Sequence, residues 1–168
     1  MTAEDFIKKW QGSINYHGLP TVGINVQWSI IPLDSKVGVL SGIKAWERLY
    51  HCVPPWFETP QTFRNLVDTK NSDYQQIVRE ETEQGKIEYY HTKGLQEPFF
   101  CVFASQDGSF NLLGDGNHRF LDCIHLIHYQ NHNFDEDIKR TSVDIIYLTN
   151  FVDVLRPDVI WKTNWVDI

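Results

Sequence analysis

The sequence has no long hydrophobic run and no secretory pattern at its start. No stretch approaches about 18 consecutive apolar residues, the length that a membrane-spanning helix needs. The first residues lack the basic and apolar segments of a signal peptide. These absences predict a soluble chain with no membrane span and no membrane partner.

Cysteine and positive charge are also scarce. The three cysteines, Cys52, Cys101 and Cys123, are an odd number inside apolar segments, which argues against a disulfide framework and indicates reduced thiols in a cytoplasmic protein. The formal net charge is −7, so we expect no broad basic surface for nucleic acid. A local basic groove is still compatible with that net charge.

Apolar and aromatic residues are abundant. They make up 42% and 14% of the 168 residues, enough for a packed core rather than a disordered chain. The length favours one domain, and no repeat, low-complexity segment or linker divides it. We expect a single domain over residues 1–168, and the sequence leaves its oligomeric state open.

Apolar periodicity and helix breakers predict interspersed helices and strands. The predicted helices are residues 2–11, a segment from Asp34 or Ser35 through Leu49, and residues 60–67, 72–84 and 120–127. The predicted strands are residues 22–31, 86–91, 99–103, 110–113 and 142–148. Thr2 and Ser72 are the expected N-caps, and Gly85 is expected to end the helix before it. The mixture indicates an α+β (mixed α/β) fold, a small mixed sheet flanked by helices.

The most informative segment is the turn motif, which we define as residues 114–119 (Gly-Asp-Gly-Asn-His-Arg). It follows a predicted strand and opens a predicted helix. A glycine-bearing turn at a helix start gathers free backbone N–H groups and the positive end of the helix dipole, which suits an anion. His118 adds a titratable group, and Arg119 adds a fork of charged donors. The motif therefore predicts a phosphate site.

The order strand, turn, strand, Gly-x-His-Arg, helix, loop, strand resembles the ParB/sulfiredoxin-like superfamily. Sulfiredoxins carry Gly-Cys-His-Arg at this point and ParB N-terminal domains carry Gly-Glu-Arg-Arg. Many uncharacterised relatives have Asp-Gly-x-His-Arg, as residues 115–119 do. Upstream, residues 84–86 and 96–103 resemble the family's helix end, glycine and apolar strand. The resemblance covers residues 72–149.

This resemblance implies a pocket for the phosphates of ATP or CTP, usually bound with Mg²⁺. It implies a Mg²⁺ contact at Asp115, catalytic roles for Asp115, Asn117 and His118, and nucleotide contacts from Gly114, Gly116, Asn117, His118 and Arg119. The family's activities differ widely, so the fold alone does not give the reaction. Asn117 stands where sulfiredoxins have their catalytic cysteine and where ParB domains have glutamate, so neither of those chemistries is expected here.

We therefore expect a nucleotide-binding enzyme that hydrolyses NTP or transfers a phosphoryl group. The amides of residues 116–118 and Arg119 would hold the phosphates, Asp115 would place Mg²⁺, and His118 would neutralise charge or move a proton. One alternative is a metal-dependent nuclease acting on DNA or RNA phosphodiesters, which a basic groove leading to Arg119 would favour. Another is a non-catalytic regulatory or interaction module, which a motif covered by the Trp-containing C-terminal tail would favour.

Each residue of the turn motif also has a purely structural interpretation. The glycines suit a tight turn with positive φ, Asp115 suits an N-cap, and Asn117 suits a hydrogen bond at the helix start. Arg119 could form a surface ion pair. Among the acidic residues outside the motif, Glu80 and Glu81 are expected on a solvated helix face, and Glu97 could approach the pocket.

Four histidines follow one another at helical spacing. On a continuous helix, His118, His125, His128 and His132 would project within an arc of about 80°. His125 with His128 or His132 could form a two-ligand surface site for a metal such as zinc. The opposite stripe is apolar, so we expect these histidines on a solvated outer face.

Overall fold

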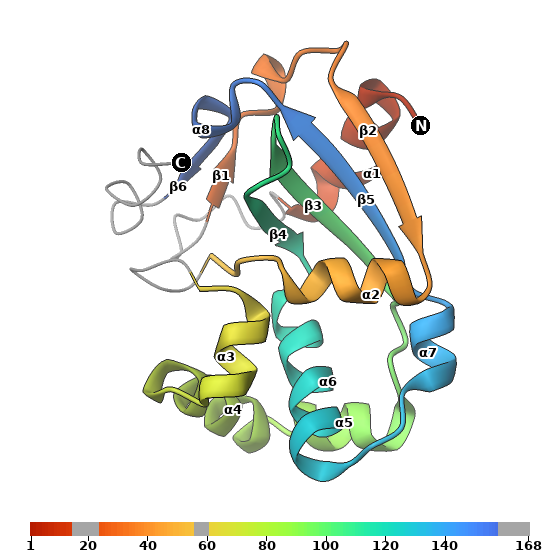
Figure 1. Cartoon of the computed structure of the whole chain (residues 1–168), viewed down its shortest axis with the longest axis vertical. Helices are drawn as coiled ribbons and strands as arrows, with labels where there is room; N and C mark the ends of the chain where they lie inside the picture. Colours follow the sequence, from red (N-terminus) through yellow and green to blue (C-terminus); the bar gives the residue numbers. More distant parts are fainter. Residues whose placement is uncertain (15–23, 56–60, 158–168) are drawn as a thin grey trace.

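A computed structural model describes residues 1–14, 24–55 and 61–157 of the chain (Figure 1). Its main sheet has four strands in the order β2-β5-β3-β4, and a second sheet pairs β1 with β6. The strands are β1 (Ile24–Val26), β2 (Lys36–Ser41), β3 (Phe99–Ser105), β4 (Asn111–Asp115), β5 (Ser142–Leu148) and β6 (Leu155–Pro157). β5 pairs antiparallel with β2 and parallel with β3, and β3 and β4 form an antiparallel hairpin, so the sheet is mixed.

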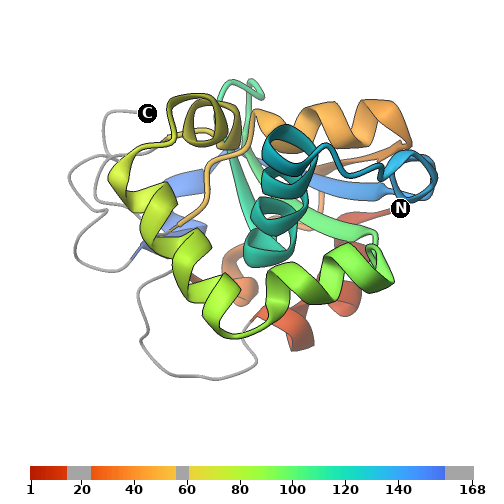
Figure 2. The same ribbon diagram turned by 90° about the horizontal axis from the view of Figure 1, so that it is seen from below.

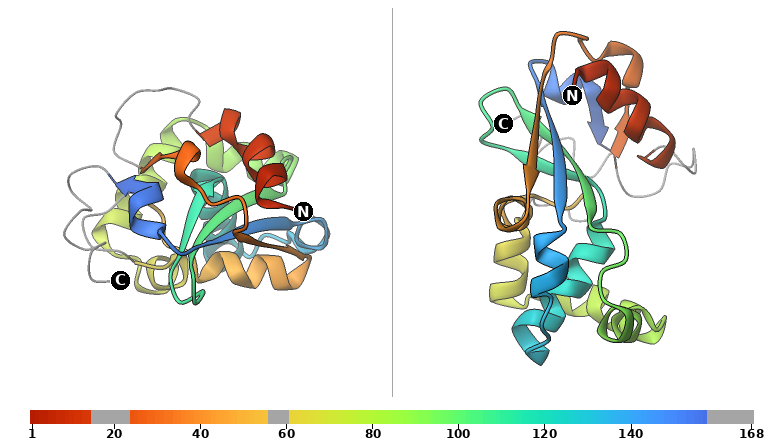
Figure 3. Two further views of the ribbon diagram at one scale, coloured as in Figure 1. Left: turned by 90° about the horizontal axis from the view of Figure 1, so that it is seen from above. Right: turned by 90° about the vertical axis from the view of Figure 1, so that its right-hand side faces the viewer.

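Helices surround this sheet, which confirms the predicted fold class. They are α1 (Ala3–Ile14), α2 (Ile43–Tyr50), α3 (Phe63–Thr69), α4 (Ser72–Glu83), α5 (Lys86–Lys93), α6 (Asn117–Gln130), α7 (Asp135–Lys139) and α8 (Phe151–Val154), with a 3-10 turn at Trp28–Ile30. Helices α3 to α6 gather at the lower end of the sheet in Figure 1. In the side view of Figure 3, α1 and α2 lie on opposite sides of the sheet. Within the described residues, no helix has the length and apolarity needed to cross a membrane.

Aromatic side chains fill the core on both faces of the sheet. Phe103 of β3 packs edge-on against Phe6 of α1, with ring centroids 5.8 Å apart. On the other face, Phe120 in the first turns of α6 contacts Trp46 of α2 at 4.9 Å and Phe63 of α3 at 5.0 Å. These contacts bury all five rings and fix the start of α6 against the sheet. The cysteines are buried free thiols, as predicted.

Local sequence signals predicted several elements well. Thr2 caps α1, because its Oγ1 accepts a hydrogen bond from the Asp5 N–H at 3.1 Å while Asp5 Oδ2 accepts one from the Thr2 N–H at 3.0 Å. The β3–β4 hairpin, α6 and β5 lie where the sequence placed them. The cap of α4 is Asn71 rather than Ser72, since Asn71 Oδ1 accepts from the Tyr74 N–H at 2.9 Å.

Two other predictions were wrong. The helix expected to begin at Asp34 or Ser35 begins only at Ile43, and residues 36–41 form the strand β2, paired over its whole length with β5. The strand expected over residues 86–91 is the helix α5, which begins after Gly85 turns the chain with a φ of 76°. In both cases pairing or packing with distant segments overrides a short and ambiguous local pattern.

The strand expected over residues 22–31 is shorter than predicted. Its described part forms β1 over residues 24–26 and is followed by the 3-10 turn, while residues 22–23 lie outside the described residues. The C-terminal tail, residues 158–168, also lies outside the described residues, so the structure does not test whether it covers the turn motif, the observation that would favour a non-catalytic module.

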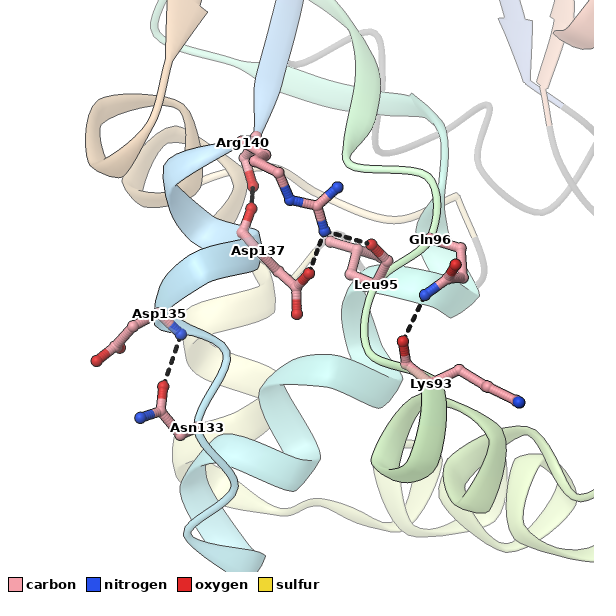
Figure 4. A network of polar contacts seen from close by, with 8 residues as sticks. Lys93, Leu95, Gln96, Asn133, Asp135, Asp137 and Arg140 are labelled. Atoms are coloured by element: carbon pink, nitrogen blue, oxygen red, sulfur yellow. Dashed lines mark hydrogen bonds and ion pairs between the residues drawn. The ribbon is translucent and has the colours of Figure 1, made fainter.

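A polar network holds the segment that leads into β3 (Figure 4). Arg140, just after α7, donates one hydrogen bond to the Leu95 carbonyl at 3.3 Å and another to the Asp137 carboxylate. The Ser142 N–H at the start of β5 donates to the Pro98 carbonyl at 2.8 Å. This network positions residues 97–99, which contact the turn motif.

Candidate functional site

The turn motif lies where β4 ends and α6 begins (Figure 1). Gly116 is the N-cap of α6, with a left-handed φ of 97°, and its carbonyl accepts a hydrogen bond from the Phe120 N–H at 2.8 Å. The N–H groups of residues 117–119 occupy the first turn, where an α-helix offers no carbonyl four residues back. The positive end of the helix dipole lies at the same place. The turn motif therefore lies at the start of a helix, as the sequence predicted, and anion binding there stays a prediction.

Both glycines of the motif are required by close packing. A Cβ atom on Gly114 would lie 2.6 Å from the Phe103 ring, and one on Gly116 would lie 2.6 Å from the Phe100 ring. Only Gly116 has a positive φ, so Gly114 serves close approach rather than backbone freedom. The two glycines press the turn against β3.

Asn117 makes the hydrogen bond at the helix start that was one of its two expected roles. Its Nδ2 donates to the Leu113 carbonyl at 3.0 Å, which ties α6 back to β4. Its Oδ1 atom is buried and has no hydrogen-bond partner among the described residues. A catalytic role for Asn117 stays a prediction.

Arg119 points toward the protein rather than straight out to solvent. Its side chain is 14% exposed, and its guanidinium donates to the Phe99 carbonyl at 2.7 Å and lies over the Phe100 ring, 4.7 Å from the centroid. Glu97 also approaches the motif, with a carboxylate oxygen 3.8 Å from the guanidinium. Arg119 thus clamps α6 to the start of β3 and brings a positive charge to the turn.

Asp115 ends β4 as a half-buried carboxylate. Burial raises its pKa, while the positive charge of Arg119 and a hydrogen bond from the Gly116 N–H oppose that rise. The N-cap of α6 is Gly116, so Asp115 does not have the capping role that its position suggested. A Mg²⁺ contact at Asp115 stays a prediction.

His118 is coupled to an acidic residue that the sequence prediction missed. Its ring is 53% exposed, and its Nδ1 atom lies 3.4 Å from Oε1 of Glu81 at the end of α4. Glu81 was expected on a solvated face, yet its side chain is only 2% exposed. The Lys86 ammonium, at the start of α5, lies 3.5 Å from the other Glu81 oxygen. The exposed histidine is therefore next to a buried carboxylate.

A second buried carboxyl group, Asp122, completes the cluster. It is fully buried one turn below His118 on α6. Burial and a hydrogen bond with Glu81 raise the pKa of Asp122. Burial also favours a higher pKa for Glu81, but hydrogen bonds from His118 and Asp122 outweigh it, so the Glu81 pKa is lowered. Asp122 is accordingly the protonated and Glu81 the ionised member of the pair.

The sequence contains a signal for both residues. Glu81 follows Tyr74 and Ile77 at helical spacing, so it continues the apolar face of α4. Asp122 lies within the apolar run that begins at Phe120. A carboxylate in a core position of a helix is rarely buried without a partner. Reading these positions as core would have identified the pair.

The other histidines of the predicted row have separate surroundings. The His125 ring hydrogen-bonds to the Tyr74 hydroxyl, and His128 Nε2 lies 2.9 Å from the Tyr50 hydroxyl. α6 ends at Gln130 with Asn131 as its C-cap, so His132 lies beyond the helix and the four histidines do not form one continuous row. In the described ranges 1–14, 24–55 and 61–157, no three ligating side chains gather to hold a metal.

Comparisons of the chain with models of protein families, with curated proteins and with solved structures found no match. The resemblance to the ParB/sulfiredoxin-like superfamily therefore rests on the motif and on the order of elements around it. Any function has to be argued from the chemistry of the turn motif and of the cluster behind it.

Proposed function

We propose that this chain binds a nucleotide through its phosphates at the start of α6 and hydrolyses it or transfers its phosphoryl group. One observation carries the proposal. His118 is half exposed in the first turn of α6, and its Nδ1 atom lies 3.4 Å from Glu81, which forms a buried pair with Asp122. An imidazole oriented by a carboxylate is a recurrent arrangement for moving protons. Buried acidic groups with opposed pKa shifts are also frequent at catalytic sites.

The phosphate contacts follow from the backbone. The Gly116 N–H is taken by the Asp115 carboxylate, so the N–H groups of residues 117–119 are the donors that we assign to the phosphates. Arg119 adds positive charge. Its contact with Glu97 is 3.8 Å long and Glu97 is 78% exposed, so a phosphate oxygen can replace that carboxylate at small cost.

Asp115 is the residue that would hold Mg²⁺, which accompanies nucleotides in the family that the motif resembles. Its half-buried carboxylate has a raised pKa because burial disfavours its charge, so a cation beside it would be favoured. Mg²⁺ on nucleotides usually takes one or two protein carboxylates, with phosphates and water completing the shell. The ion would supply charge neutralisation at the phosphate oxygens.

The test is a thermal-shift and hydrolysis screen with ATP, CTP and GTP, each with Mg²⁺. A nucleotide at one hundred times its Kd should stabilise the wild type by about 2.7 kcal/mol, which raises Tm by several degrees. His118→Ala should abolish turnover, and Arg119→Lys should reduce the nucleotide-induced shift, each measured against the variant's own ligand-free Tm. His51→Ala, an exposed histidine at the end of α2, is the matched control and should behave as wild type. A wild type that no nucleotide stabilises would contradict the proposal.

A further inference from the structure

Glu81 receives contacts from two helices besides its own. It lies in the last turn of α4, Lys86 approaches it from the start of α5, and His118 and Asp122 approach it from α6. Figure 2 shows α4 and α5 running around α6, the arrangement that brings these groups together. The described contacts of Glu81 therefore include two nitrogens and a second carboxyl group around a side chain that is 2% exposed.

Electrostatic interactions assign the protons in this cluster. An ionised carboxylate attracts an N–H group and repels a nitrogen lone pair, so we infer that the hydrogen of His118 is on Nδ1, which lies 3.4 Å from Glu81 Oε1. When the imidazole is neutral, its proton is then on Nδ1 and its lone pair is on Nε2. Burial and the neighbouring Glu81 carboxylate raise the pKa of Asp122, so Asp122 is the member of the pair that keeps its proton. The interactions of Glu81 with His118 and Asp122, and then the positive charge of Lys86 at 3.5 Å, lower the pKa of Glu81.

We propose that Glu81 is the positioning residue that fixes the tautomer of His118, so that Nε2 is a proton acceptor and His118 is a general base. This inference rests on the proposed function for the reaction it serves, whereas the tautomer is a property of the free protein. It replaces the alternative expectation that His118 is a fixed positive charge on the phosphates. The second substrate that it implies is an O–H nucleophile, either water or the hydroxyl of an acceptor.

The step balances without a further reactant. Nε2 of His118 takes the proton of the attacking O–H group. At the same time, the oxygen of that group forms a bond to the terminal phosphorus of the nucleotide. The bond from that phosphorus to the bridging oxygen breaks, and the nucleoside diphosphate leaves with the electron pair. The proton on Nε2 then passes to solvent. Glu81 stabilises the resulting imidazolium, because its carboxylate lies 3.4 Å from Nδ1.

Neighbouring charged and titratable groups are consistent with this assignment. Tyr90 of α5 interacts electrostatically with Asp122, Arg119 and Glu81, and burial raises its pKa to about 12, so it stays neutral. Lys86 of α5 is the lysine that interacts with Glu81, and Arg119 of α6 interacts with Tyr90. The charge of Glu81 is thus compensated inside the cluster before any ligand binds.

The experiment reads the His118 tautomer by long-range ¹H–¹⁵N NMR of the ligand-free protein, at a pH where the ring is neutral. The wild type should show a protonated Nδ1, against the Nε2–H form that histidine prefers in water. Glu81→Gln keeps an acceptor oxygen and should retain the wild-type tautomer, and Asp122→Asn keeps a neutral donor and should retain it too. Glu81→Leu should release the ring to the Nε2–H form. Glu83→Leu, exposed on the same helix, is the matched control.

Kinetics separate positioning from a merely structural role. Glu81→Leu should lower kcat roughly a hundredfold, within the range for loss of general base catalysis, with KM nearly unchanged. Glu81→Gln should recover part of that loss. A protonated Nε2 in the neutral wild type would overturn the inference even if nucleotides bind. If Glu81→Leu does not fold, the wild-type and Glu81→Gln spectra still decide. Failure of nucleotides to bind would instead contradict the proposed function and leave the tautomer result standing.

Discussion

At the residue scale, Asp122 is a carboxyl group that the fold buries completely and keeps protonated. Burial is the main cause of its raised pKa, and the neighbouring Glu81 carboxylate adds to it. The folded chain therefore holds a proton that the unfolded chain releases above the ordinary aspartate pKa of 3.8. Between this ordinary pKa and the raised pKa of Asp122 in the folded chain, the free energy of unfolding therefore falls as the pH rises. Glu81, whose pKa is lowered, acts with the opposite sign and only in acid, where its contribution is lost as it protonates.

Asp122→Asn should remove this pH dependence while keeping a donor for Glu81. As the pH rises, the free energy of unfolding of the variant should increase relative to that of the wild type, by up to about 1.4 kcal/mol per pH unit. Urea denaturation from about pH 5 to pH 8 measures it, since Asp122 differs in protonation between the two states across that range. A difference that stays constant with pH would show that Asp122 is ionised in the folded chain.

Gly116→Ala should destabilise the protein. Its φ of 97° is strained for alanine, and the new Cβ would lie 2.6 Å from the Phe100 ring and 2.7 Å from the Arg119 guanidinium. We expect a loss of about 1–3 kcal/mol in urea denaturation, the range for a residue held in a disfavoured backbone region. Gly12→Ala is the matched control, because Gly12 lies inside α1 with nothing within 4 Å of its Cβ position. It should stabilise by about 0.5–1 kcal/mol.

At the element scale, α1 is tied to the sheet by a buried carboxylate. Asp144 in β5 is 2% exposed, and its Oδ2 accepts hydrogen bonds from the Lys9 ammonium at 2.6 Å and the Trp10 indole N–H at 2.9 Å. Asp144 lies opposite Cys101 in the register of β5 and β3, so the anchor is in the middle of the sheet. The anchor fixes α1 by charge as well as by its apolar face.

Lys9→Met should weaken this anchor and leave Asp144 with less compensation. Because the Asp144 carboxylate is buried, we expect the free energy of unfolding to fall by about 1.5–3 kcal/mol, the range for a hydrogen bond to a charged group. The matched control is Lys8→Met, since Lys8 pairs with Glu4 on the exposed surface and should contribute under about 0.5 kcal/mol. Equal effects of the two substitutions in urea denaturation would contradict the anchoring role of Asp144.

The elements that the sequence predicted correctly are those whose signals are local. The β3–β4 hairpin and the start of α6 follow from an apolar run, a turn and two glycines, at positions where a larger side chain would clash with β3. β2 was mistaken for helix because its pattern is mostly half exposed and contains Gly38, and its strand conformation depends on pairing with β5. α5 was mistaken for strand because eight residues carry too little periodicity to decide.

At the scale of the whole molecule, the candidate site is assembled from segments that the sequence does not show to be neighbours. The turn motif could be located from the chain alone, because its residue types and position before a helix suffice. Glu81 could not be joined to His118 in that way, since only the packing of α4 and α5 around α6 brings them together (Figure 2). Arg119 likewise acquires its inward role from the Phe99 carbonyl at the start of β3.

A different part of the molecule offers the natural comparison for ligand binding. A cavity of about 270 Å³ lies where β3 and β5 end, at the opposite end of the sheet from α6 (Figure 1), and its lining includes Ser105, Leu148 and Phe151. It contains no cluster like that of Glu81, Asp122 and His118 in its lining. Phosphates are therefore expected to bind at the turn motif and not in this cavity.

The most direct measurement is a ¹H–¹⁵N NMR titration of the backbone amides with ATP, CTP and GTP in the presence of Mg²⁺. If phosphates bind at the start of α6, the amide chemical shifts should change saturably and most strongly at residues 116–119. The chemical shifts of the His118 ring should change as well. His118→Ala should keep the amide shifts and lose turnover, because the backbone binds the phosphates and the imidazole moves the proton. Shifts that are absent with all three nucleotides, or largest around Ser105 and Phe151, would contradict the phosphate site at the start of α6.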